Sequence, residues 1–201
     1  SNPGKVSAEV AQELAEKEFE KYEENFRKIE AAQPVSDFDK LALENINLKK
    51  KLILANSITY EDLNLPSDHL IHGDYLYHNT FYNTGNQVSY IFDFEKTDYS
   101  PRTYELFRSM MYSFLSQDID QTSLNKAKLY FDSYLNIYPM NKNELERGLR
   151  LFYFKLIYGF WVESEHYLKN NNRTDHFLSF EIMRIKYLSQ NLEQLGDIML
   201  K

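Results

Sequence analysis

The chain of 201 residues contains no cysteine, and this absence excludes several kinds of chemistry at once. Without thiols there is no disulfide framework, no thiolate metal site and no cysteine nucleophile. The lack of cysteine fits a reducing compartment, so we expect a cytoplasmic protein. Glycine and proline are also scarce, at six and five residues, and no linker rich in them divides the chain.

Long apolar runs and an excess of positive charge are missing too. The longest apolar stretch, residues 151–162, contains Lys155 and is too short to cross a bilayer, so we expect a buried helix and no membrane partner. The formal net charge of -7 argues against a nucleic-acid groove, because phosphate backbones are held by clustered lysine and arginine. The length fits one soluble domain over residues 1–201.

Helical spacing of apolar residues dominates both ends of the chain. We predict an amphipathic helix over residues 7–32 and a second helix that begins with a Ser36–Asp39 capping box and runs to about Ala55. Ser100 followed by Pro101 predicts a cap and the first residue of a helix that ends near Leu115. Further N-caps are predicted at Thr122, at Thr174 and at Asn141, the last in a capping box with Glu144.

The middle of the chain has a different pattern. Leu70 and Ile71 predict a short strand, and TFYNTGNQVSYIFDFE, residues 80–95, predicts a β-hairpin with Gly85 supplying a positive φ in the turn. The fold class predicted is therefore α+β and predominantly helical, with one small hairpin.

The residues that carry chemistry flank this hairpin, in IHGDYLYHNTFYN (71–83) and IFDFEK (91–96). Asp74 and Asn79 lie five positions apart on a loop and can converge on one point. Phosphoryl transfer needs two such oxygens, one to orient or deprotonate the attacking hydroxyl and one to hold magnesium. Asp93, after the apolar residues 88–92, adds a third oxygen group of the type that binds magnesium beside substrate phosphates.

These two motifs resemble the HGDxxxxN and [IV]DF[ED] signatures of the aminoglycoside phosphotransferase and choline kinase superfamily, which has a protein-kinase-like fold. YSPRTYELFRSM, residues 99–110, is similar to the stretch that follows the metal aspartate in this family, with Glu105 where an aspartate is usual. DFEKTDYSPR is also similar to the choline and ethanolamine kinase branch, although that branch usually has Asn where this chain has Gly73.

The resemblance implies a role for each motif residue. Asp74 would be the catalytic base, and Asn79 and Asp93 would bind Mg2+ and, through it, the phosphates of ATP or GTP. His72 would brace the loop, and Glu105 would accept hydrogen bonds from the loop backbone. The acceptor would be a small-molecule hydroxyl, with an aminoglycoside, choline or ethanolamine, a sugar and a homoserine-like alcohol all open.

The resemblance covers the C-terminal lobe of the kinase-like fold. Before His72 the sequence reads as helix, with Gly4 as its one glycine, so it holds no glycine-rich phosphate loop. The chain opens SNPGKV without a methionine, and we expect it to be one lobe of a longer enzyme that has its own N-terminal nucleotide lobe. The alternative is a natural protein that has lost this lobe and does something else. Alone, this chain is expected to be inactive.

An acceptor site is predicted at YGFWVESEHY, where Tyr158, Trp161 and Glu165 stand at helical spacing. Aromatic rings with a nearby carboxylate can hold an ammonium group, although such a stripe is also typical of a helix core. The oligomeric state is open.

Two other classes of function remain open. A metal-dependent hydrolase could use His72, Asp74, His78 and Asp93 as ligands, since imidazoles and carboxylates build such sites. A non-catalytic interaction module, or pseudokinase, could use the amphipathic helix at 7–32 to pack on a partner.

Overall fold

The computed structural model describes residues 20, 36–55, 63–116 and 119–200. The described chain divides into two compact units. The first unit contains residues 63–152 and 193–200, and the second contains residues 36–55 and 153–192. The helix predicted at 7–32 lies outside the described residues, and the single domain over the whole chain stays a prediction.

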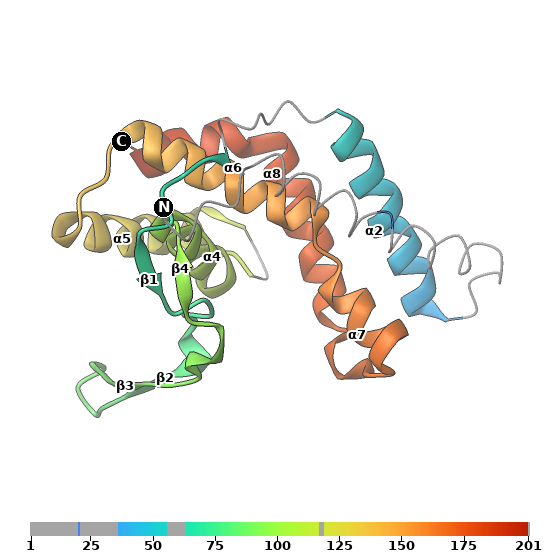
Figure 1. Ribbon diagram of the computed structural model, residues 1–201, viewed down its shortest axis with the longest axis horizontal. Coiled ribbons are helices and arrows are strands. Elements are labelled where there is room, and N and C mark those ends of the chain that lie inside the picture. Colours follow the sequence, from blue (N-terminus) through green and yellow to red (C-terminus); the bar gives the residue numbers. More distant parts are fainter. Residues whose placement is uncertain (1–19, 21–35, 56–62, 117–118, 201) are drawn as a thin grey trace, which may run out of the picture. The chain divides into compact units, whose positions relative to one another are not determined.

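Two short antiparallel strand pairs carry the motif segment in the first unit (Figure 1). β1 (His69–Ile71) pairs with β4 (Asp98–Ser100). Between them in sequence lies the predicted hairpin of β2 (Thr80–Tyr82) and β3 (Val88–Ile91). The pairing of β1 with β4 was not predicted. It brings the two ends of the segment 72–97 together, and every motif residue except Glu105 lies within this segment.

The hairpin turn differs from the prediction in the residue that adopts a positive φ. Asn86, with φ 58, takes this conformation, and Gly85 does not. The side chain of Asn83 explains the difference, because its Oδ1 accepts the backbone N–H groups of Gly85 and Gln87 at 2.9 and 3.0 Å. Asparagine tolerates the left-handed region well, so the turn does not need its glycine there.

The first unit is built on α4 (Arg102–Phe114), α5 (Gln121–Ile137) and the first part of α6 (Lys142–Tyr158). Phe107 of α4 packs on Phe131 of α5 with ring centroids 5.1 Å apart. The buried apolar side chains of these helices are Leu106, Phe107, Met110, Met111, Ala127, Phe131, Leu145, Leu149, Leu151 and Phe152. This packing fixes α4, the helix that supports the motif loop.

Two of the predicted caps are confirmed. The Ser36 hydroxyl accepts the Asp39 N–H at 3.0 Å, and the Asp39 carboxylate accepts the Ser36 N–H at 2.9 Å, which completes a capping box. Asn141 Oδ1 accepts the Glu144 N–H at 2.8 Å. Glu144 does not close that second box, because its carboxylate forms an ion pair with Arg102.

Three predicted helix starts were wrong. Ser100 ends β4, and Pro101 is the N-cap of α4 rather than its first helical residue. Asp120 caps α5 in place of Thr122, because its carboxylate accepts a backbone N–H of the first turn at 2.8 Å. Thr174 lies in a short 3₁₀ helix, and α8 begins only after it. In the described part of the chain the 3₁₀ helices are η1 (Tyr77–Asn79), η2 (Phe94–Lys96) and η3 (Asn172–Thr174).

The second unit consists of α2 (Asp37–Leu54), the end of α6, α7 (Trp161–Lys169) and most of α8 (Phe177–Leu200). Its apolar core contains Ala42, Val162, Leu178 and Ile182, with Phe38, Leu41, Leu48 and Tyr167 packed around them. The fold is predominantly helical α+β, as predicted. Within the described residues, no helix is both long and apolar enough to cross a membrane.

Candidate active site

The loop that follows β1 depends on a glycine. Gly73 has φ 80, in the left-handed region that other residues rarely adopt. A Cβ added at this position would lie 2.1 Å from the carbonyl oxygen of Lys96, which is far too close for any side chain. The backbone of the motif loop therefore packs directly on the backbone of η2, and only glycine permits this approach.

Glu105 holds the same loop from the other side. It lies in the first turn of α4, and its two carboxylate oxygens accept the backbone N–H groups of His72 and Gly73 at 3.0 and 2.6 Å. Hydrogen bonds to a charged acceptor are shorter and stronger than neutral ones. The extra methylene of glutamate, relative to aspartate, does not prevent this contact.

His72 connects the loop to the hairpin. Its Nε2 lies 2.9 Å from the carbonyl oxygen of Phe92, and its Nδ1 lies 3.3 Å from the backbone nitrogen of Asp74. A carbonyl can only accept and a backbone N–H can only donate, so the pattern fits the tautomer with hydrogen on Nε2. The ring is buried against Phe94, with centroids 4.7 Å apart. Both ring nitrogens are thus engaged within the protein.

Asn79 makes a second connection between the loop and the hairpin. Its side chain is buried, and its Nδ2 donates to the carbonyl of Asp74 at 2.8 Å. The backbone carbonyl of Asn79 accepts the backbone N–H of Phe92 at 3.1 Å. Because Phe92 is bound through its N–H by Asn79 and through its carbonyl by His72, the next residue, Asp93, is delivered beside the loop.

Asp93 has an unusual backbone conformation. Its φ of 67 and ψ of 57 place it in the left-handed region, which costs energy for any residue with a side chain. The residue is exposed, and its carboxylate has no hydrogen bond or ion pair with the described residues. An uncommitted carboxylate on a strained backbone is typical of a functional position.

Asp74 lies between two cations. Arg108 Nη2 contacts Oδ1 at 2.6 Å, and Lys96 Nζ contacts Oδ2 at 3.0 Å. The Asp74 side chain is 13% exposed, and this burial acts to raise its pKa. The charge of Arg108 and the hydrogen bond from Lys96 outweigh burial and hold the pKa of Asp74 below its ordinary value of 3.8.

Neither cation was identified from the sequence. Arg108 lies three residues after Glu105 on α4, which places both side chains on the same face of the helix. Lys96 directly follows the DFE triplet. Helical spacing from Glu105 could have pointed to Arg108, whereas the role of Lys96 depends on the close contact of η2 with Gly73.

The predicted acceptor residues do not share one helix face. α6 ends at Tyr158 and α7 begins at Trp161, so the assumption of one continuous helix was wrong. Each aromatic side chain contacts a different ring: Tyr158 stacks on Phe154, and Trp161 packs at a tilt against Phe177. Glu165 accepts hydrogen bonds from Lys169, the last residue of α7, and from Asn171, which follows the helix.

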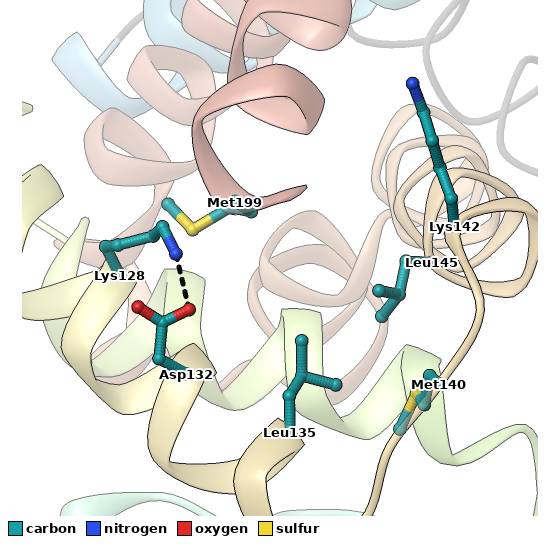
Figure 2. A pocket seen from close by; sticks show the side chains of 7 residues that line it. All are labelled: Lys128, Asp132, Leu135, Met140, Lys142, Leu145 and Met199. Atoms are coloured by element: carbon teal, nitrogen blue, oxygen red, sulfur yellow. Dashed lines mark hydrogen bonds and ion pairs between the residues drawn. The ribbon is translucent and has the colours of Figure 1, made fainter. Parts of the chain in front are cut away.

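Two hollows among the described residues lie apart from the motif residues. One, of about 240 Å³, is an open hollow lined by α5, α6 and the end of α8, and Figure 2 shows the Lys128–Asp132 ion pair at its edge. Its lining is Lys128, Asp132, Leu135, Met140, Lys142, Leu145 and Met199. The other, of about 380 Å³, is a mostly apolar hollow of the second unit lined by Leu41, Glu44, Ser179, Ile182, Met183 and Lys186. None of the candidate site residues lines either hollow.

The oxygen atoms present fit magnesium better than zinc. The described residues contain no group of three His, Asp or Glu side chains able to hold a metal ion. Both nitrogens of His72 are already engaged, so the hydrolase alternative based on His72, Asp74, His78 and Asp93 is not favoured. Magnesium prefers oxygen ligands and needs only one or two from the protein beside substrate phosphates, which Asn79 Oδ1 and the Asp93 carboxylate can supply.

Comparison with known proteins agrees with this site. The model of the phosphotransferase enzyme family matches residues 8–134, which is more than half of the chain and includes both motifs and Glu105. No curated protein and no solved structure gave a significant match. The chain therefore belongs to the phosphotransferase enzyme family, and its architecture is that of the C-terminal lobe of a kinase-like fold, as the motifs predicted.

Proposed function

We propose that this lobe serves a phosphotransferase that moves the γ-phosphate of ATP or GTP to a hydroxyl of a small molecule. The observation that carries the proposal is the double anchoring of Phe92 by His72 and Asn79, which sets Asp93 beside the loop of Asp74. A base and a magnesium-binding carboxylate on neighbouring segments are what this reaction requires.

Asp74 acts on the acceptor as a carboxylate. Its lowered pKa keeps it ionised at neutral pH, so it accepts a hydrogen bond from the acceptor hydroxyl and orients the oxygen for attack. Such a weak base takes the proton late, when the new bond to phosphorus has made the hydroxyl acidic. Asn79 and Asp93 hold magnesium, which supplies charge neutralisation for the phosphates when it is bound.

Lys96 and Arg108 position Asp74 and add positive charge to the site. Arg108 is 18% exposed and holds Oδ1 from the body of the unit. Lys96 is 55% exposed and can release Oδ2 to the acceptor hydroxyl at little cost. Its ammonium then remains next to the place where phosphoryl charge develops, where a cation is most useful.

The same cations bear on the acceptor. A cationic group directly beside the reacting hydroxyl would be repelled by Lys96 and Arg108, which favours sugars and other neutral or acidic alcohols. The contact of Gly73 with the Lys96 carbonyl leaves no room for the asparagine usual in the choline and ethanolamine branch. We also retain the proposal that a nucleotide lobe outside residues 1–201 completes the enzyme.

The metal half of the site is testable in this chain alone. Manganese, a paramagnetic substitute for magnesium, added with ATP should broaden the NMR signals of the Gly73 backbone amide and the Asn79 side-chain amide. Asp93→Asn should abolish the broadening, because it removes the charged ligand. Asp98→Asn, which changes an exposed carboxylate on β4, should leave it intact. Equal broadening in the Asp93→Asn variant, or none in the folded wild type, would overturn the proposal.

A further inference from the structure

The second unit contains a cluster of ionisable and polar side chains that the phosphotransferase chemistry does not use. Asn45 and Lys49 come from α2, Glu163 from α7 and Glu181 from α8. Their exposed fractions lie between 0 and 2%. Charged and polar groups this deeply buried are costly unless they form hydrogen bonds, so each oxygen and each hydrogen of the cluster is expected to have a partner.

Lys49 is committed to Glu181. Its Nζ lies 2.6 Å from Glu181 Oε1 and also donates to the carbonyl of Gly159. The ammonium lies 4.4 Å from the centroid of the Phe160 ring, which adds a cation–π contact. The charge of Glu181 is therefore balanced by a lysine that is fully enclosed.

Asn45 uses both hydrogens of its amide. Nδ2 donates to Glu163 Oε1 at 2.7 Å and to Glu181 Oε1 at 3.3 Å. Two buried oxygens then remain, Asn45 Oδ1 and Glu163 Oε2, and neither has a hydrogen-bond donor among the described residues. Turning the Asn45 amide over would face its oxygen toward two carboxylates, so the observed orientation is the favourable one.

The two unsatisfied oxygens belong to planar groups that already share one hydrogen bond. In a carboxylic acid paired with an amide, the N–H donates to one acid oxygen and the acid O–H donates back to the amide oxygen. A single proton on Glu163 Oε2 would satisfy both oxygens and remove the second negative charge from the cluster. Burial favours this neutral form and raises the pKa of Glu163, Lys49 opposes the rise, and Glu181 adds to it.

We propose that Glu163 is a protonated carboxylic acid in the folded protein at neutral pH and forms a cyclic acid–amide pair with Asn45. A metal ion is a poor alternative occupant, because the described residues offer no cluster of acidic or histidine ligands and the site is closed to solvent. Two further titratable groups on these helices are Arg184, buried one turn beyond Glu181, and Tyr167, whose hydroxyl donates to Asp39 at 2.6 Å.

The pair makes the stability of the second unit dependent on pH. The folded state retains a proton that the unfolded chain releases, so the stabilisation is complete below the ordinary glutamate pKa of 4.5. It is lost as the pH rises through the higher value of the folded state. Each unit by which the pKa is raised changes the folding equilibrium about tenfold.

Carbon NMR of the chain with labelled glutamate side chains tests the protonation state directly. At neutral pH, one Cδ signal should have the shift of a carboxylic acid, and Glu163→Gln should remove that signal. Finding every glutamate in the carboxylate range at neutral pH would overturn the proposal without any variant having to fold.

Stability measurements give an independent test. Glutamine can replace the acid in the same cyclic pair, so Glu163→Gln should gain stability relative to wild type as the pH rises from about 5 to about 9. The matched control, Glu181→Gln, removes the partner of Lys49 and should lose stability across this range. A Glu163→Gln variant that is destabilised at high pH as much as the control would show that Glu163 is ionised, and would overturn the proposal.

Discussion

Asp74 in the first unit and Glu163 in the second are both carboxylates close to a basic side chain, yet their pKa values move in opposite directions. Burial acts to raise the pKa of Asp74, but Arg108 and Lys96 together bring it below its ordinary value. At Glu163 burial dominates, and the attraction of Lys49 does not cancel it.

The number of cations per carboxylate and the degree of burial account for this contrast. Asp74 has a cation at each oxygen and keeps 13% of its side chain exposed. Glu163 is 1% exposed, and the lysine nearest to it is bound to Glu181. A neighbouring lysine therefore does not by itself keep a carboxylate charged. The same residue types lower the pKa of the carboxyl in the candidate site but do not prevent a raised pKa in the buried cluster.

The largest loss of folding stability is expected from Lys49→Met. This change keeps the length of the side chain but leaves Glu181 buried without its cation, and breaking a buried pair in this way costs about 3–5 kcal/mol. Urea unfolding followed by the fluorescence of Trp161, the single tryptophan and a residue of α7, reports on this unit.

Lys186→Met is the matched control for Lys49→Met. Lys186 pairs with Glu44 in the same unit, but both side chains are about half exposed, at 51 and 49%. Such a pair contributes below about 1 kcal/mol. Equal losses for the two variants would show that burial does not separate these ion pairs, and the contrast between the two regions would fail.

Glu105→Gln addresses the loop that carries Asp74. The amide can accept only one of the two backbone N–H groups now bound by the carboxylate, and its own NH₂ would face the other. We expect a loss of about 1.5–3 kcal/mol. Hydrogen exchange at the amides of His72 and Gly73 should become faster, whereas Glu95→Gln, on exposed η2, should leave it unchanged. Unchanged exchange in Glu105→Gln would mean that the loop is held by other contacts.

The loop, hairpin and supporting helix could be predicted because each has a local signal. The HGD and DFE motifs, the capping box at Ser36, the N-cap at Asn141 and the alternation around the turn depend on residues only a few positions apart. The helix over 7–32 remains a prediction.

Contacts between distant segments could not be read from the sequence. The pairing of β1 with β4 joins short segments separated by the hairpin. The contacts of Lys96 and Arg108 with Asp74 depend on this pairing. The break at Gly159 and Phe160 was missed because apolar residues continue through it. The buried cluster around Glu163 draws on three helices, and a glutamate in a helix is otherwise typical of a solvated face.

Arg108→Gln tests whether Arg108 favours the charged form of the Asp74 carboxyl group. The pKa of Asp74 should rise, because its largest source of attraction is removed. A lowered pKa gives stability that is present above the ordinary value of 3.8 and is lost as the pH falls through the folded value. The variant should therefore be less stable near neutral pH, by about 1 kcal/mol, with a smaller further loss in acid. Carbon NMR of Asp74 Cγ measures the titration, and an unchanged midpoint would contradict the assignment.

The smallest effect is expected from Lys96→Met. More than half of this side chain is exposed, so solvent screens its ion pair with Asp74, and the loss of stability should be about 0.2–0.5 kcal/mol. Lys142→Met, which breaks the exposed pair with Glu146, is the control and should give a similar value. Manganese–ATP broadening at Gly73 and Asn79 distinguishes the two lysines, because of the two only Lys96 contacts Asp74, beside the proposed phosphate position. A weaker signal in Lys96→Met alone supports its place in the site, whereas equal signals in both variants assign Lys96 to the fold.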